Sequence, residues 1–133
     1  METIVVGYIP SPQGVSALEA AVDRAKRTGG RITVVNTGRN GNYADPPFAP
    51  EPHMDAIDQQ LTKAGIPHEV LQPIDGRSAA DQILTVAQET KADLVIIGIR
   101  GRSPVGKLIT GSTAQQILLG AHCAVLAVKA SSG

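Results

Sequence analysis

The chain has 133 residues, a formal net charge of zero and a single cysteine, Cys123. A chain of this length forms one domain and can bury a core without disulfides or metals. The balanced charge counts against a nucleic-acid binder, and the lone cysteine favours a reducing compartment. The first residues lack the basic start and the apolar run of a secretory signal, and no stretch approaches the roughly 18 apolar residues of a membrane span. We therefore expect one soluble cytoplasmic domain over residues 1–133, without nucleic acid as a partner and without membrane insertion.

Short apolar runs alternate with amphipathic stretches along the whole chain. The expected strands are residues 4–8, 32–35, 68–71, 94–97 and 124–128, and the expected helices are residues 16–26, 53–64, 78–89 and 112–119. Strands that alternate with helices form right-handed crossovers and a parallel sheet covered on both faces. The pattern predicts a Rossmann-like, doubly wound α/β fold with the run at 68–71 at an edge. Ligands of such sheets bind at the carboxyl ends of the strands, which directs attention to the loops after the first and fourth strands.

Residues 38–52 separate the second expected strand from the next helix and are rich in proline and glycine. They include Asn40-Gly41-Asn42 and four prolines. Proline removes a backbone donor and fixes φ, so this segment is predicted to be a flexible loop. Its length indicates either a lid over a binding site or a disordered excursion of the chain.

The segment that follows the fourth strand carries the strongest chemical signal. Its glycines are Gly98, Gly101, Gly106 and Gly111, and its basic residues are Arg100, Arg102 and Lys107. Glycine lets a ligand approach the backbone, and Gly111-Ser112-Thr113 opens a helix whose free N–H groups favour an anion. Residues 94–133 contain no Asp or Glu and carry four basic residues, the last of which is Lys129. These features favour a polyphosphate ligand.

Residues 101–108 come close to the Walker A pattern but depart from it at one decisive position. Gly106 and Lys107 fit the pattern, whereas Leu108 stands where a magnesium-binding hydroxyl is required. The helix is also expected to begin only at Gly111, too late for Lys107 to lie at its first turn. The segment is therefore not predicted to be a P-loop of an NTPase.

The spacing Gly98-x2-Gly101-x9-Gly111-Ser112 resembles the nucleotide motif of the universal stress protein family, in the subset that binds ATP. Residues 76–83, 92–98 and 122–128 are also similar to that family. The resemblance implies a sheet of five parallel strands in the order 3-2-1-4-5, with about four helices on its two faces. It also implies a homodimer formed through the last strand, Ala124–Val128.

The resemblance further implies how an adenine nucleotide would be held. Gly98 and Gly101 would lie against the ribose and phosphates, with Arg100 and Arg102 supplying charge, and Thr37 would lie near the adenine. Gly111, Ser112 and Thr113 would donate to the phosphates. The family usually carries an Asp-Gly-Ser sequence after its first strand, but this chain has Ile9-Pro10-Ser11. Ile9 and Pro10 would then adjoin the base without a carboxylate, which counts against magnesium as a cofactor.

Three function classes remain open from the sequence. The first is a regulatory stress-response module that acts through nucleotide occupancy and dimerisation, with ATP as the first ligand and AMP, ADP or cyclic AMP as alternatives. The second is a dimeric protein-interaction module that binds no nucleotide, and the third is a slow ATPase. No general base is positioned near the glycines, no catalytic residue is assigned, and the scattered histidines show no metal-ligand spacing, so an enzyme is disfavoured.

Overall fold

The structure is a computed structural model that describes residues 2–8, 12–36, 51–72, 78–99 and 112–129. Strands and helices alternate through the described parts of the chain. In chain order they are β1 Thr3–Tyr8, α1 Pro12–Thr28, β2 Arg31–Asn36, α2 Glu51–Lys63, β3 His68–Leu71, α3 Ala79–Thr90, β4 Leu94–Ile99, α4 Ser112–Gly120 and β5 Ala124–Lys129. This alternation confirms the predicted α/β class.

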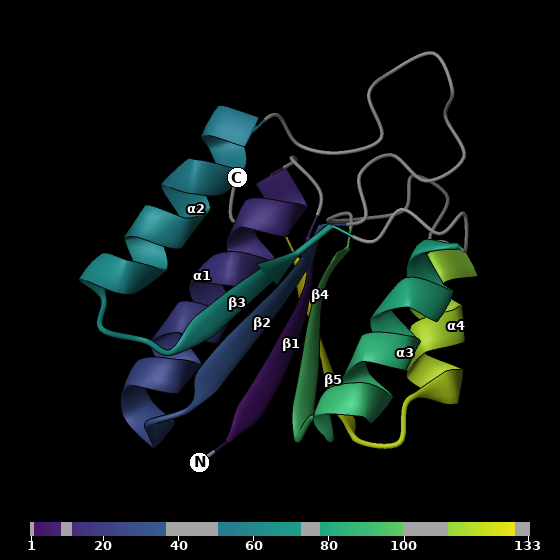
Figure 1. Ribbon diagram of the computed structural model, residues 1–133. Helices are drawn as coiled ribbons and strands as arrows, with labels where there is room; N and C mark the ends of the chain where they lie inside the picture. The colour runs from purple at the N-terminus through teal and green to yellow at the C-terminus, as the bar shows by residue number, and fades with distance from the viewer. Residues whose placement is uncertain (1, 9–11, 37–50, 73–77, 100–111, 130–133) are drawn as a thin grey trace.

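The five strands form one parallel sheet in the order β3-β2-β1-β4-β5. Helices α1 and α2 cover one face of the sheet, and helices α3 and α4 cover the other (Figure 1). The predicted doubly wound arrangement and strand order are therefore confirmed. Strand β3 lies at one edge, as expected, and β5 lies at the other.

Alternate residues of the inner strands enter two separate cores. The core under α1 and α2 contains Ile4, Val6, Ile32, Val34 and Ile96 from the sheet. The core under α3 and α4 contains Val5, Val35, Val95 and Ile97. Because both faces of the strands are buried, the sequence shows continuous apolar runs instead of alternation.

Several element boundaries differ from the prediction. Helix α1 begins at Pro12, about one turn before the expected Ser16, because proline at the first helical position has a suitable φ and needs no N–H partner. Helix α2 begins at Glu51, where a loop was expected. Its second residue is Pro52, and proline is tolerated in the first turn of a helix. Strand β4 continues through Gly98 to Ile99, so Gly98 belongs to the strand and not to the loop after it.

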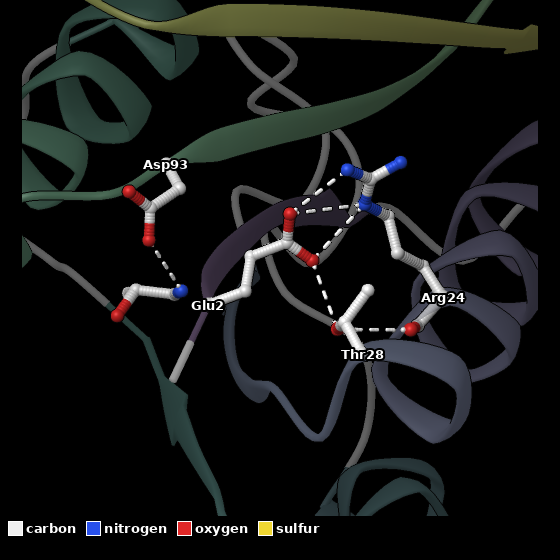
Figure 2. A network of polar contacts seen from close by, with 5 residues as sticks. Glu2, Arg24, Thr28 and Asp93 are labelled. Carbon is white, nitrogen blue, oxygen red and sulfur yellow. Dashed lines mark hydrogen bonds and ion pairs between the residues drawn. The ribbon is translucent and has the colours of Figure 1, made fainter.

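Polar contacts tie the N-terminal segment to the sheet edge at which the strands begin (Figure 2). Arg24 Nη2 lies 2.9 Å from Glu2 Oε2, and its Nε donates to both carboxylate oxygens of Glu2. Thr28 Oγ1 lies 3.1 Å from Glu2 Oε1. The Thr3 N–H donates to Asp93 Oδ2 at 2.9 Å, and the Asp93 N–H donates to the Thr3 carbonyl at 2.8 Å. These bonds join β1 to α1 and to the start of β4.

Strand β5 leaves apolar surface open at its edge of the sheet. Leu126 is 41% exposed, and on the neighbouring helix α4 Leu119 is 88% exposed. An edge strand with uncovered apolar side chains is a common site of pairing with another chain. Within the described residues, none of the helices has the length and apolar character needed to cross a membrane.

Candidate functional site

The carboxyl ends of β1, β2 and β4 meet at one edge of the sheet. Tyr8 ends β1 and is in register with Asn36 at the end of β2, while Gly7 of β1 is in register with Ile97 of β4. From β1 the chain proceeds through α1 to β2 on one side, and from β4 it proceeds through α4 to β5 on the other. The connections diverge between β1 and β4, and such a divergence opens a crevice at the carboxyl edge.

Gly98 lies at this crevice and in close contact with the start of helix α1. A Cβ atom at Gly98 would lie 2.5 Å from the carbonyl carbon of Gln13 and 3.0 Å from its Cβ, and it would overlap the Gln13 carbonyl oxygen. The obstacle is backbone, which cannot move aside by changing a rotamer. Gly98 is therefore required for the packing of β4 against α1, in addition to any role beside a ligand.

All four helices begin at the same edge, because each follows a strand of one parallel sheet. Helix α1 begins at Pro12, α2 at Glu51, α3 at Ala79 and α4 at Ser112. Ser78 caps α3, as predicted, with its side chain accepting from the Asp81 N–H at 3.1 Å. The N-terminus of a helix carries a partial positive charge from the helix dipole, which favours an anion over a cation at this edge.

Most of the predicted site residues lie outside the described part of the chain. Gly98 is described fully, and the backbone of Ser112 and Thr113 is described as the first turn of α4. The predicted residues that the structure does not describe are Ile9, Pro10, Thr37, Arg100, Gly101, Arg102 and Gly111. The predicted lid also lies outside it, from residue 38 to residue 50. Their roles therefore stay predictions.

Two buried polar side chains at this edge were not singled out from the sequence. Tyr8 is 1% exposed, and Asn36 is fully buried. They are register partners, so their side chains lie on the same face of the sheet, the face covered by α1 and α2. Burial raises the pKa of the Tyr8 hydroxyl, which keeps it protonated as a hydrogen-bond donor. A polar residue at the last position of a buried strand was the signal that could have found them.

Cys123 and His68 both have surroundings typical of structural residues. Cys123 packs against the core beneath α3 and α4, and burial followed by the negative charge of Asp93 raises the pKa of its thiol. A raised pKa keeps the sulfur as an unreactive thiol. His68 is bonded to Asp58. Among the described residues no three His, Cys, Asp or Glu side chains gather into a metal site.

Comparison with known proteins identifies the family. The sequence profile described as "Universal stress protein family" matches residues 1–129. The chain belongs to the universal stress protein family. A universal stress protein of Mycolicibacterium smegmatis is 40% identical over 126 residues, which cover 95% of this chain and 96% of the relative. The resemblance seen in the glycine motif thus extends over nearly the whole of this family member.

Solved structures of universal stress proteins share its fold. One from Archaeoglobus fulgidus has a TM-score of 0.75 and 30% sequence identity, covering 97% of this chain and 98% of the other. A second structure from Archaeoglobus fulgidus, a universal stress protein in complex with dAMP, has a TM-score of 0.62 and 21% identity, covering 97% and 98%. At that identity the second comparison shows a shared fold.

Proposed function

We propose that this chain binds an adenine nucleotide, with ATP as the preferred ligand, at the carboxyl edge of its sheet. The observation that carries the proposal is the spacing Gly98-x2-Gly101-x9-Gly111-Ser112 in a member of the universal stress protein family. Gly98 stands where β4 ends in the crevice between diverging connections, and Ser112 opens α4 there. A neighbour of the same fold is described in complex with dAMP, which supports an adenine ligand.

Each part of the glycine segment has a role in this proposal. The backbone around Gly98 and Gly101 lies beside the ribose and phosphates, and Arg100 and Arg102 supply positive charge. Gly111, Ser112 and Thr113 donate to phosphate oxygens from the start of α4, where the helix dipole favours an anion. Thr37 and the Ile9-Pro10 pair adjoin the base.

Ile9 makes the binding independent of magnesium in this proposal. The family's usual carboxylate is absent at this position, and an apolar side chain cannot ligate a hard cation. Basic side chains and helix N–H groups then neutralise the phosphates without a metal. We therefore expect ATP affinity to change little when magnesium is added or chelated.

The proposed biological role is regulatory. Nucleotide occupancy at the carboxyl edge would be passed to a protein partner through a homodimer in the cytoplasm. The apolar edge of β5, where Leu126 is 41% exposed, supports pairing with a second copy of the chain. Sedimentation of wild type and Leu126→Lys tests this part, because a charge at the edge should shift a dimer toward monomer.

Calorimetric titration with ATP, with and without magnesium, is the experiment that tests the proposal. Titrations with AMP, ADP and cyclic AMP then rank the ligands. Gly101→Asp should abolish the heat of binding, because its carboxylate would repel phosphates and its side chain would fill the approach to the backbone. Gly133→Asp makes the same chemical change at the chain end and should bind as wild type. Unchanged affinity in Gly101→Asp, with the fold intact, would refute the proposed site.

A dimeric interaction module without a ligand is the second candidate. The exposed apolar residues of β5 and α4, together with Ile9 in place of an acid, favour it. This candidate predicts a stable dimer that shows neither binding heat nor a thermal shift with any adenine nucleotide at millimolar concentration. Phosphate release above the uncatalysed rate, lost in Gly101→Asp, would instead favour the slow ATPase.

A further inference from the structure

Both ring nitrogens of His68 face hydrogen-bond acceptors. Nδ1 lies 2.8 Å from the carbonyl oxygen of Ile66, and Nε2 lies 2.7 Å from Asp58 Oδ1. A neutral imidazole has one N–H donor and one lone pair, so it can donate to only one of these oxygens. Only the doubly protonated ring satisfies both contacts. The geometry therefore selects the imidazolium form.

The surroundings of His68 leave Asp58 as the charged group that acts on it. The His68 side chain is 13% exposed, and Asp58 reaches it from helix α2. From β2 the register partner is the apolar Ile32, whose N–H donates to the Pro67 carbonyl. The other charged residues of these elements whose exposure the structure describes are all exposed: Arg31 on β2, Asp55 and Lys63 on α2, and Glu69 on β3.

The hydrogen bonds of His68 also determine the direction in which its pKa is shifted. Burial lowers the pKa, but the hydrogen bond to the Ile66 carbonyl and the bond and charge of Asp58 outweigh that effect, so the pKa is raised. A raised pKa extends the charged form toward neutral pH, in accord with the two acceptors.

The pair joins two elements that have few other ties to the molecule. Strand β3 has four residues and pairs on one side only, with β2. Helix α2 is held to the sheet mainly through the buried side chains of Ile57 and Leu61. Units at a sheet edge with few buried contacts open locally at a lower free energy than the core. One charged pair can therefore have a marked effect on how firmly α2 is held.

We propose that the proton on His68 is a pH-sensitive latch that holds helix α2 against strand β3 through Asp58. A neutral His68 must give up one of its two hydrogen bonds and its attraction to Asp58. The folded state binds this proton more tightly than the unfolded chain does. The latch is therefore fully closed below the unfolded pKa of histidine, about 6.5, and it opens as pH rises through the higher folded value. This inference does not depend on nucleotide binding.

Proton NMR of the whole chain tests the latch through two readouts. The first is the titration of the His68 ring, assigned by its loss in His68→Gln. The second is amide hydrogen exchange in α2, corrected for the intrinsic effect of pH and compared with exchange in β1. We expect the protection of α2 to fall through the His68 transition, by at most about tenfold per pH unit for a single proton. The protection of β1 should stay constant.

Variants on α2 and β3 separate the latch from general charge effects. Asp58→Asn should lower the His68 titration midpoint and loosen α2 below the transition. Asp55→Asn removes the same charge three residues earlier, on an exposed position of the helix, and should change neither. His68→Gln should abolish the pH dependence of α2 exchange while the chain stays folded. A His68 midpoint at or below 6.5, or a pH dependence of α2 that persists in His68→Gln, would overturn the proposal.

Discussion

Replacing Gly98 with alanine should destabilise the fold whether or not a nucleotide is present. The new Cβ would lie 2.5 Å from the Gln13 carbonyl carbon, while ordinary contact begins near 3.4 Å. Strand β4 and the first turn of α1 would have to separate by at least about 0.9 Å, the difference between these distances, because the carbonyl oxygen of Gln13 is closer still. Overpacking of this kind costs about 1–3 kcal/mol, and we expect the upper end of that range because backbone meets backbone.

Gly7→Ala provides the matched control for this prediction. Its Cβ would also come within 2.5 Å of an atom, but that atom is the terminal Cδ1 of the Ile83 side chain, which can adjust. Alanine also regains about 0.5–1 kcal/mol over glycine in a strand interior, so the net change should be below about 1 kcal/mol. Urea unfolding followed by circular dichroism measures both variants. If Gly98→Ala is as stable as wild type, or more stable than Gly7→Ala, the packing argument is wrong.

Three further substitutions test individual interactions by unfolding measurements. Ser78→Ala removes the cap of α3 and should lower the free energy of unfolding by about 1 kcal/mol. Thr33→Val should raise the free energy of unfolding by about 1 kcal/mol, because the buried Thr33 Oγ1 has no hydrogen-bond partner among the described residues. A loss of stability in this variant would indicate a partner for the hydroxyl. Glu2→Gln should lower stability at neutral pH and match wild type in acid. The bond from Arg24 holds the pKa of Glu2 below its usual 4.5, so the stabilisation is present above pH 4.5 and is lost as pH falls through the folded value. A difference between wild type and Glu2→Gln that persists in strong acid would contradict this account.

The fold could be predicted from the sequence because its strands are buried on both faces. Apolar β-branched runs such as residues 4–6 and 94–97 are hard to accommodate in any other element, and glycines mark where α1, α2 and α4 end. Gly29, at the end of α1, has φ of 72°, a conformation that favours glycine. Helix starts were predicted less well. Pro52 was assigned to a loop although proline is tolerated in a first helical turn, and the first helix was expected from Ser16 and not from Pro12.

Contacts between distant parts of the chain could not be predicted from the sequence. The sequence suggested that Gly98 leaves room for a ligand, but the backbone of Gln13 that it contacts belongs to a different element. Likewise, nothing in the spacing of Asp58 and His68 indicates that a helix and an edge strand bring them together. Local patterns specify elements, whereas such pairs depend on how the elements dock.

Different interactions hold the two edges of the sheet. This difference explains how residues at the proposed binding edge can change without loss of the fold. At the amino edge, Glu2 and Asp93 fix β1 to α1 and to β4 through charged and backbone hydrogen bonds. At the carboxyl edge, Gly98 packs closely against the start of α1 because it has no side chain, and all four helices begin there. The dipole at a helix start favours an anion, and an anion bound there breaks none of the bonds that hold the amino edge. In the proposed function, residues between the elements, such as Ile9, can therefore change the ligand while the two cores and the amino edge keep the sheet intact.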